Sequence, residues 1–462
     1  MNASHTETVT STEVRMKLGS LASVFSTCRS LVASPASSFQ LPPRNRTHPA
    51  HKMVNSAMSS SENNKRPKLS SRVSITDPPI ITKTKAIMAG REDVMSLAQG
   101  VVHWAPPEAS FAAVRASLQS VDSAVNQYGP TAGLPELKAA LLEKLEVENG
   151  LTGVDLMVTA GANQAYTNVV LTLTDEGDRC VLFAPYYFNH LMAHQMTGGA
   201  DRVSMGPCCS GTLHPDLSWL KDQLQGPDPP RMVTIVNPCN PTGVLLSKEE
   251  VQQAVKICDD AGAWLVLDNT YEHFVYGGRE HYCASGPNVI NIFSFSKAYG
   301  MMGWRMGYVA FPADGEVGPQ MDKIQDTIPI CPTQASMVMA LGAVKAGRGW
   351  VEEHVRSLEP NRKAIIDALS PLGTVGNGVA GGEGAIYIWA KLPEGCGSDE
   401  DVMKWLVERH GVCVIPGSSC GCPGYIRVAF ANMTPELCQK AANRLKAGLA
   451  ELVEKQAAAV AS

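Results

Sequence analysis

The amino-acid sequence predicts an α/β fold, with a doubly wound, mostly parallel sheet joined to a smaller α+β domain. Short apolar runs recur through the middle of the chain, helix-length stretches separate them, and the pattern changes after about Lys345. Short runs rich in Val, Ile and Leu that end at Gly, Pro or Asn are typical of buried parallel strands. Alternating strands and helices predict a doubly wound sheet, in which ligands bind beyond the carboxyl ends of the strands.

The expected elements follow in chain order. We expect buried parallel strands at 156–159, 180–184, 232–236, 264–268, 289–293 and 307–311. Between the third and fourth, Ser247-Lys248-Glu249-Glu250 forms a capping box that predicts the start of a helix. Further on we expect a long helix near 349–369, strands at 385–391, 412–415 and 425–430, and a final helix near 434–455. The predicted domains are a large domain at 121–344 and a small domain made of 76–120 and 345–456.

The composition restricts the class of protein without indicating its chemistry. The 462 residues are 44% hydrophobic and 18% charged, which excludes a mainly disordered, collagen-like or coiled-coil chain. A net charge of −5 gives no general attraction to nucleic acid or anionic membranes, and no apolar run approaches the ~20 residues that span a bilayer. The 13 cysteines have no CxxC or zinc-type spacing, so we expect free thiols in a reducing compartment and no metal site.

Residues 1–75 differ from the rest of the chain. No acidic residue occurs between Glu13 and Glu62, whereas arginine, lysine and serine recur. Acid-poor N-termini rich in Arg and Ser are typical of organelle transit peptides, whereas acidic residues such as Glu7 and Glu13 near the start of the chain are not typical of them. Two interpretations stay open: a transit peptide for a plastid or mitochondrion, or a disordered extension of a cytoplasmic protein whose translation starts at Met53 or Met58.

The strongest chemical signal follows the run at 289–293. Lys297 comes shortly after this run, near the expected carboxyl end of a buried strand. A desolvated lysine beside cations has a lowered amine pKa, which Schiff-base chemistry needs. Ser294, Ser296 and Arg305 supply hydroxyl and guanidinium donors that suit a phosphate. The segment therefore indicates a lysine suited to Schiff-base chemistry beside a phosphate site, the alternative being a surface lysine in a Gly-rich loop.

Three other strand ends carry polar groups. After 232–236, two X-Pro steps stiffen a loop and can hold Asn240 as a donor. Asp268 ends an apolar run, with Tyr271 three residues later. A buried carboxylate needs a partner, which a protonated ring nitrogen would provide, unless Asp268 is a helix N-cap. After 156–159, Ala162 and Asn163 begin a helix whose free N–H groups can bind phosphate.

Together these motifs resemble the class I and II aminotransferases, pyridoxal-phosphate-dependent enzymes of fold type I, over roughly residues 77–453. By this resemblance, Lys297 would form the Schiff base with the cofactor and later transfer the proton. Asp268 would pair with the pyridine nitrogen, while Asn240 and Tyr271 would donate to the ring oxygen. The phosphate would be held by the backbone of Ala162 and Asn163 and by the side chains of Ser294, Ser296 and Arg305.

Four further residues match the family. Tyr187 corresponds to the aromatic residue stacked on the cofactor ring, and His190 to the partner that supports the aspartate. Tyr128 corresponds to the tyrosine that reaches the phosphate from the other subunit, so the resemblance implies a homodimer with shared active sites. Arg427 corresponds to the arginine that binds the substrate α-carboxylate bidentately.

The segments 97–104 and 294–308 are most similar to plant-type aromatic aminotransferases, which use aromatic amino acids and methionine with 2-oxo acids such as pyruvate, 2-oxoglutarate or phenylpyruvate. Gly100, Trp104 and Asn240 are further expected to bind the substrate. Dicarboxylate-specific relatives carry a second arginine in the region that corresponds to 327–332, which has none here. A desolvated side-chain carboxylate would lack its partner there. We therefore expect Trp104 and Tyr128 to line an apolar pocket for aromatic or thioether side chains.

The resemblance implies a ping-pong transamination, in which the first 2-oxo acid leaves before the second binds. A pyridoxal-phosphate-dependent β-lyase shares nearly every motif and stays open as an alternative. A ligand-sensing regulator is disfavoured because Lys297 and Asp268 are both retained. A serine hydrolase built on the G-x-S-x-G match at Ser419 is disfavoured because Pro423 and Gly424 break the helix that should follow.

Overall fold

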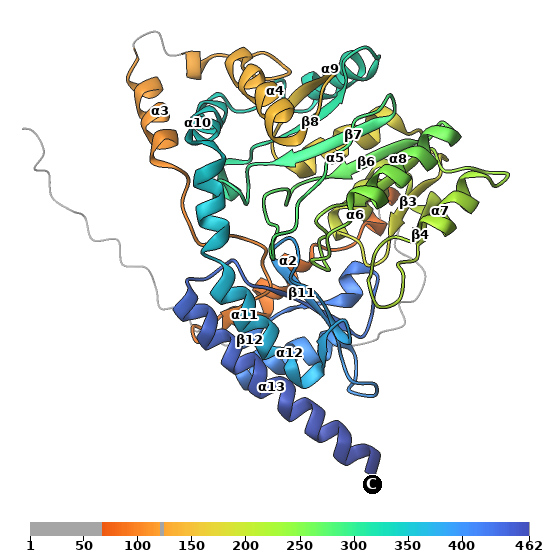
Figure 1. Ribbon diagram of the computed structural model, residues 1–462, viewed down its shortest axis with the longest axis vertical. Coiled ribbons are helices and arrows are strands. Elements are labelled where there is room, and N and C mark those ends of the chain that lie inside the picture. The colour runs from red at the N-terminus through yellow and green to blue at the C-terminus, as the bar shows by residue number, and fades with distance from the viewer. Residues whose placement is uncertain (1–66, 121–123, 462) are drawn as a thin grey trace, which may run out of the picture. The chain divides into compact units, whose positions relative to one another are not determined.

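The computed structural model describes residues 67–120 and 124–461, and the compact unit that contains them begins at Pro67. Its centre is a seven-stranded sheet in the order β2-β8-β7-β6-β5-β3-β4 (Figure 1). The strands are β2 (Val154–Thr159), β3 (Cys180–Phe183), β4 (Val203–Gly206), β5 (Met232–Val236), β6 (Trp264–Asp268), β7 (Val289–Ser294) and β8 (Gly307–Pro312). All the strands expected in this part of the chain form, within two residues of their expected ends.

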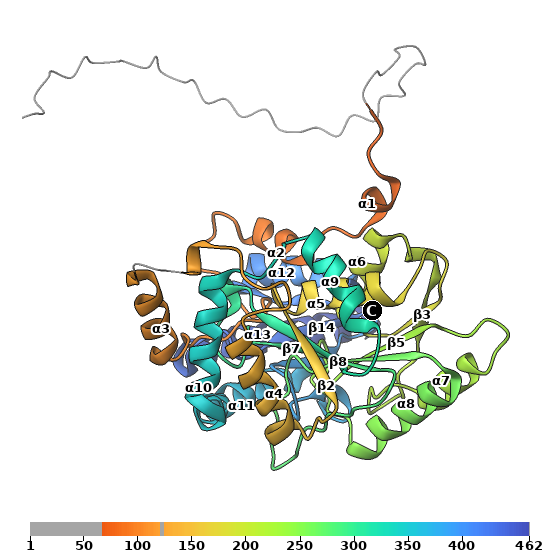
Figure 2. The same ribbon diagram turned by 90° about the horizontal axis from the view of Figure 1, so that it is seen from above.

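Helices cover both faces of this sheet, as the doubly wound prediction requires. On one face pack α5 (Ala162–Leu173), α6 (Phe188–Thr197) and α9 (Val317–Thr327), and on the other α7 (Leu217–Leu224) and α8 (Lys248–Ala261) (Figure 2). Successive strand residues alternate between the faces: Met232 packs with α5, whereas Val233 packs with α8. The capping box at Ser247 is present, because Glu250 N–H donates to the Ser247 hydroxyl and the Glu250 carboxylate accepts from Ser247 N–H.

Two details of the sheet differ from the prediction. The strand expected to be parallel at 307–311 is β8, which runs antiparallel to both β2 and β7. The connection from β7 to β8 contains only the short 3-10 helix η3 (Met302–Trp304), and a parallel return needs a longer crossover. Strand β4 was not expected, because it lies at the sheet edge and most of its residues are partly exposed, which leaves little apolar pattern.

A second, mainly antiparallel sheet follows, in the order β13-β14-β11-β10-β9. Its strands are β9 (Thr374–Val375), β10 (Gly378–Gly381), β11 (Tyr387–Lys391), β13 (Ile415–Pro416) and β14 (Tyr425–Ala429). A separate parallel pair joins β1 (Met95–Ser96) to β12 (Val412–Cys413). Around these strands lie α2 (Ile80–Met88), α11 (Glu359–Ala368), α12 (Asp399–His410) and α13 (Pro435–Ala461), in the lower part of Figure 1. Lys83 on α2 pairs with Glu400 on α12 at 2.6 Å.

Two predictions for this region were wrong. The helix expected at 349–369 is the end of α10 (Gln334–Arg356) followed by α11, with a break between Arg356 and Glu359. Helix α10 is itself interrupted at Gly347, whose φ of 81° is open to glycine. The strand expected at 412–415 is the two short strands β12 and β13, because the chain leaves one sheet at Cys413 and enters the other at Ile415.

The remaining helices are α1 (Ser71–Ile75), α3 (Glu108–Gln119), α4 (Pro135–Asn149) and the 3-10 helices η1 (Ala124–Asn126), η2 (Ala200–Arg202), η4 (Ser370–Leu372) and η5 (Gly417–Cys420). The expected extension at 1–75 lies mostly outside the described residues, but its last part forms the exposed helix α1. Within the described ranges the cysteines are free thiols, and no helix is long and apolar enough to cross a membrane.

One apolar core connects the two sheets. It includes Leu97, which follows β1, together with Phe293 on β7 and Ile426 on β14, and all three are fully buried. The same core takes in the inner faces of α4 and α10. The division into a large and a small domain therefore stays a prediction, while the shared core holds the two sheets against each other beside the site described next.

Candidate active site

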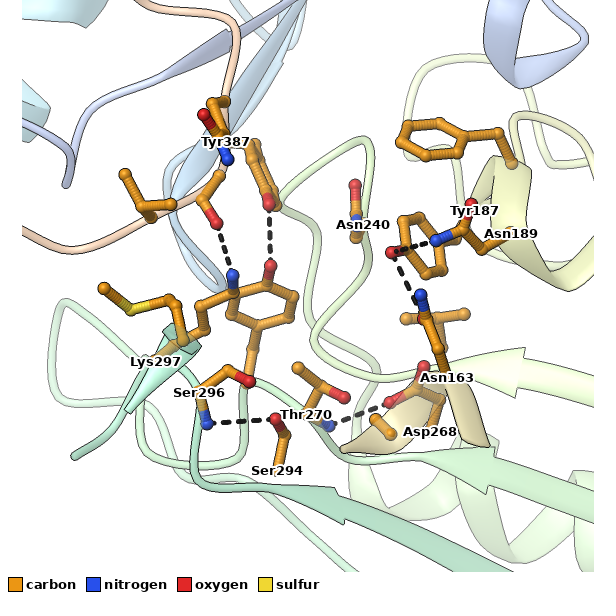
Figure 3. A pocket seen from close by; sticks show the side chains of 18 of the residues that line it. Asn163, Tyr187, Asn189, Asn240, Asp268, Thr270, Ser294, Ser296, Lys297 and Tyr387 are labelled. Carbon is orange, nitrogen blue, oxygen red and sulfur yellow. Dashed lines mark hydrogen bonds between the residues drawn. The ribbon is translucent and has the colours of Figure 1, made fainter. Parts of the chain in front are cut away.

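A cavity of about 390 Å³ opens where the carboxyl ends of β5, β6 and β7 meet the second sheet (Figure 3). Most of the residues expected in the site line it: Gly100, Ala162, Asn163, Tyr187, His190, Asn240, Asp268, Tyr271, Ser294, Ser296, Lys297, Arg305 and Arg427. In Figure 3, Lys297 and Tyr387 lie on one side of the cavity, and Asp268, Asn163 and Tyr187 on the other. Residues far apart in the sequence thus face one another across a space large enough for a small molecule.

Lys297 is the amine of this cavity. It follows β7, and its Nζ donates to the backbone oxygen of Gly100. Burial, and then the positive charges of Arg305 and Arg427, lower the pKa of Lys297 to about 7. Since an ordinary lysine titrates near 10.5, a large fraction of this amine is uncharged and nucleophilic at neutral pH.

Asp268, the last residue of β6, is a buried carboxylate with fixed partners. Its Oδ2 lies 3.1 Å from Nε2 of His190, and its Oδ1 accepts from Thr270 N–H at 2.9 Å. Burial by itself would raise the pKa of Asp268, but the hydrogen bond and charge of His190 and the Thr270 donors hold it below the ordinary value. The carboxylate therefore stays ionised, and it can hold a proton on a basic nitrogen that enters the cavity.

An anion-binding corner is formed by the start of α5 and the loop after β7. The N-terminus of α5 has no side-chain cap, so the N–H groups of its first turn are available to a ligand. Arg305 crosses this corner, with Nη2 donating to Ala160 O at 3.3 Å. Gly161 has φ of 88°, which is open to glycine, and a Cβ there would lie 2.3 Å from that Nη2, so a larger residue would displace the guanidinium. Arg305 itself has φ of 50°, a strained backbone that the surrounding structure must hold in place.

Arg427, on β14, is a fully buried cation in the opposite wall. Its Nη1 donates to Oδ1 of Asn240 at 2.8 Å, and its Nη2 to the backbone oxygen of Ala98 at 2.8 Å. Its Nε is buried and has no hydrogen-bond partner within the described chain. Asn240, with its oxygen engaged by Arg427, has its NH₂ group to offer to a ligand.

Tyr187 closes the side of the cavity above Asp268. Its hydroxyl accepts from Nδ2 of Asn189 at 2.9 Å and donates to Oδ1 of Asn163 at 3.4 Å (Figure 3). Burial raises the pKa of Tyr187 to about 12, so the phenol stays protonated near neutral pH. Its ring stands edge-on to His190, with 5.2 Å between centroids.

Two expected site residues lie elsewhere. Trp104 is in the apolar core, where its ring stacks on Phe274 at 6.3 Å and its Nε1 donates to Ala298 O. It does not line the cavity, because its indole is enclosed by core side chains. Tyr128 is 80% exposed and also lies outside the cavity of its own chain. Its expected contact with the phosphate of another subunit stays a prediction.

Sequence reasoning missed other residues of the wall: Ile81, Thr270, Met302 and Tyr387, together with the neighbours Gln99, Val101, Phe188, Asn189 and Val236 of expected residues. Thr270 could have been found, since it lies two residues after Asp268, within reach of the carboxylate. Tyr387 carries no such signal. It lies on a strand of the second sheet, and nothing in the sequence shows that this strand faces the cavity.

The comparisons with known proteins agree with this geometry. The sequence matches the family aminotransferase class I and II over residues 92–445, most of its length. The chain therefore belongs to the class I and II aminotransferases. It is 49% identical over 388 residues to the aromatic aminotransferase ISS1 of Arabidopsis thaliana, a match that covers 83% of this chain and 97% of that protein. Members of the family generally depend on pyridoxal phosphate, and the chain is a transaminase of this kind.

Solved structures confirm the fold. An aspartate aminotransferase from Thermus thermophilus with maleate superposes with a TM-score of 0.75 at 26% identity, and covers 83% of this chain and 100% of its own. An aromatic aminotransferase from Pyrococcus horikoshii gives a TM-score of 0.71 at 28% identity, with 80% and 99% covered. The predicted fold type I architecture, with its mostly parallel central sheet and smaller antiparallel sheet, is confirmed.

Proposed function

We propose that the enzyme transfers the amino group of an aromatic or methionine-type amino acid to a 2-oxo acid such as pyruvate, 2-oxoglutarate or phenylpyruvate, by a ping-pong mechanism. The observation that carries the proposal is the convergence of Lys297, Asp268 and Arg427 on one cavity. A nucleophilic amine, an ionised carboxylate and a buried guanidinium are together what transamination on pyridoxal phosphate requires.

The residues of the cavity fit pyridoxal phosphate. The uncapped start of α5, with Ser294, Ser296 and Arg305, suits the phosphate, and Tyr187 offers a ring face. Asp268 suits a protonated pyridine nitrogen, because no lysine or arginine of the described residues pairs with it and its ion-pair contact is with His190. When bound, the cofactor supplies an aldehyde that condenses with amines and a ring that accepts the electron pair of the substrate Cα.

The substrate carboxylate has a matching site at Arg427. None of the ion pairs within the described chain involves this guanidinium, and its Nε lacks a partner although it is buried. An uncompensated buried cation is costly, so an entering carboxylate gains by pairing with it. The α-carboxylate would thereby be held in one orientation while the Nζ of Lys297 takes the proton from Cα and passes it to the cofactor carbon instead of back to Cα.

The apolar part of the wall supports the choice of side chain. Ile81, Val101, Phe188 and Met302 line the cavity, and its only described arginines are Arg305 and Arg427. With one serving a phosphate and the other the α-carboxylate, a second substrate carboxylate would lack a partner. The aromatic aminotransferase named above, at 49% identity, supports the same choice.

We further propose a homodimer with shared active sites. Besides Tyr128, the side chains of Ile328 and Ile330 are 55% and 41% exposed, in a segment from which an apolar interface could be built. The free cysteines of the described residues support a reducing compartment, the cytoplasm or the interior of an organelle.

A substrate panel tests the proposal. The amino donors are Trp, Tyr, Phe, Met, Asp and Ala, each offered with pyruvate, 2-oxoglutarate and phenylpyruvate. Two possible products are assayed: the new amino acid, which a transaminase forms, and ammonia, which a lyase releases. We expect an aromatic amino acid or methionine to give the highest kcat/KM, without ammonia. A best rate for Asp with 2-oxoglutarate would overturn the side-chain proposal, and stoichiometric ammonia would show a lyase instead.

A further inference from the structure

Tyr387 contacts several groups of the cavity at once. It lies on β11 in the second sheet and is 2% exposed. Its hydroxyl oxygen is 2.6 Å from that of Tyr271, which is also buried (Figure 3). No role for Tyr387 follows from the motifs in the sequence, yet it is the direct partner of a residue expected to donate to the cofactor.

Tyr387 also determines what can stand at position 100. A Cβ on Gly100 would lie 1.8 Å from the Tyr387 hydroxyl oxygen, so the tyrosine and any larger residue exclude each other. The backbone oxygen of Gly100 accepts from Nζ of Lys297. The close packing of Tyr387 on Gly100 therefore places the carbonyl that receives the lysine amine.

The ring of Tyr387 supports the substrate-binding cation. The guanidinium carbon of Arg427 lies 4.2 Å from the centre of this ring. A cation over an aromatic face at that distance is stabilised electrostatically, and more so when both groups are buried. The ring thus compensates part of the charge of Arg427 without occupying its unpartnered Nε.

We propose that Tyr387 is a positioning residue for the transamination: its hydroxyl donates to the Tyr271 hydroxyl, so that the single proton of Tyr271 points into the cavity, and its ring holds Arg427 in place. The inference rests on the proposed function, because the acceptor of the Tyr271 proton is the ring oxygen of the cofactor.

Counting protons leaves two directions for this hydrogen bond, and the proposed function selects between them. Burial raises the pKa of both phenols, so each keeps its one proton, and one hydroxyl must accept from the other. If Tyr271 donated to Tyr387, it would have no proton for the cofactor. Donation by Tyr387 leaves the Tyr271 proton free and, by polarising that hydroxyl, makes Tyr271 a stronger donor.

The test is Tyr387→Phe in the enzyme loaded with pyridoxal phosphate, which removes the hydroxyl and keeps the ring. Tyr276→Phe is the matched control, because the Tyr276 hydroxyl is also buried but has no partner in the described chain and lies outside the cavity. A donor to the ring oxygen lowers the pH midpoint of the cofactor's visible absorption by favouring the charged oxygen. We expect Tyr387→Phe to raise this midpoint by about 0.5 to 1 unit and Tyr276→Phe to leave it unchanged.

Kinetics separate the hydroxyl from the ring. Tyr387→Phe should lower kcat by about 3- to 10-fold with KM for the amino acid unchanged. Tyr387→Leu, which also removes the ring from Arg427, should in addition raise that KM by about 3- to 10-fold. In the Tyr271→Phe background, Tyr387→Phe should shift the absorption midpoint no further, because the proton that it directs is already gone.

A midpoint for Tyr387→Phe equal to that of the wild type, or a shift that adds fully to that of Tyr271→Phe, overturns the inference. Tyr387→Leu gives a second, independent readout, the rise in KM, and a KM equal to that of the wild type overturns the part of the inference that concerns the ring. A wild-type enzyme that neither binds pyridoxal phosphate nor transaminates overturns the proposed function instead. The two failures are distinguished by the wild type alone.

Discussion

Two cavities of similar size differ in whether their charged side chains are paired with opposite charges. The second, here called the charged cavity, has about 410 Å³ and is lined by Glu148, Asn149, Glu272, His273, Val275, Arg279, Glu280, His281, Arg348, Glu352, Val355 and Arg356. There the charged groups neutralise one another: Glu272 pairs with the buried Lys144 at 2.5 Å, and Arg348 with Glu352 at 2.7 Å. In the first cavity, which is the candidate active site and is called the active cavity from here on, Lys297, Arg305 and Arg427 form no ion pair within the described chain.

The pKa values express this difference. In the charged cavity, burial by itself would raise the pKa of Glu272, but the nearby Lys144 lowers it to about 2. In the active cavity the nearest charges to Lys297 are like charges, and they add to the effect of burial. Paired charges hold a structure together, whereas cations without a carboxylate partner are held ready for the anionic groups of ligands.

The largest expected effect comes from removing the unpaired amine. Lys297→Met should lower transamination by about 1,000-fold or more, because no other lysine of the described residues lines the cavity and could take the Cα proton. The loss of activity is measured with the best substrate pair, and the loss of the lysine's bond to the cofactor is measured by the visible absorption of the bound cofactor. Activity retained within tenfold of the wild type would show that Lys297 is not the reacting amine.

The same substitution at the paired lysine should act on stability. Lys144→Met leaves the carboxylate of Glu272 buried without its cation, and we expect the free energy of unfolding to fall by about 3–5 kcal/mol. Lys297→Met should not lower the stability of the cofactor-free protein, because it removes a buried amine without an acidic partner. Urea denaturation of both variants measures the contrast, and equal losses for the two would contradict it.

A smaller effect concerns pH. In the proposed function the neutral form of Lys297 is the one that would react with the cofactor aldehyde, and with a pKa of about 7 this form is half populated near pH 7. The rate of cofactor loading into the free protein should therefore rise about tenfold per pH unit below pH 7 and level off above it. Stopped-flow absorbance follows the reaction, with Tyr276→Phe as a control that should keep the profile. A rise that continues to pH 10 would indicate an ordinary lysine and contradict the lowered pKa.

Local patterns in the sequence were enough for one wall of the active cavity. Lys297 and Asn240 follow buried strands closely and Asp268 is the last residue of one, and parallel strands bring their carboxyl ends to one edge of a sheet. Errors arose where a local pattern does not report the partner strand. The antiparallel direction of β8 and the change of sheet between Cys413 and Ile415 depend on pairings made across the whole chain.

The residues of the opposite wall could be predicted from the sequence only in part. Arg427 came from a resemblance, and Trp104, taken from the same source, lies in the core. Packing against segments that are distant in the sequence decides whether an aromatic side chain close to a cavity residue in the sequence points into the cavity or away from it. Tyr387 is the opposite case: it lines the cavity, although its strand has an apolar pattern like that of any other core strand.

The sequence by itself determined the family and the fold class and predicted which amine reacts, because strand ends, turns and caps are local and their order along the chain is preserved in the fold. The tertiary structure decided which cations stay unpaired, which tyrosine partners Tyr271, and how Gly100 meets Lys297. These are contacts between segments separated by more than a hundred residues, and only the packing of the two sheets on one core brings them within hydrogen-bond distance.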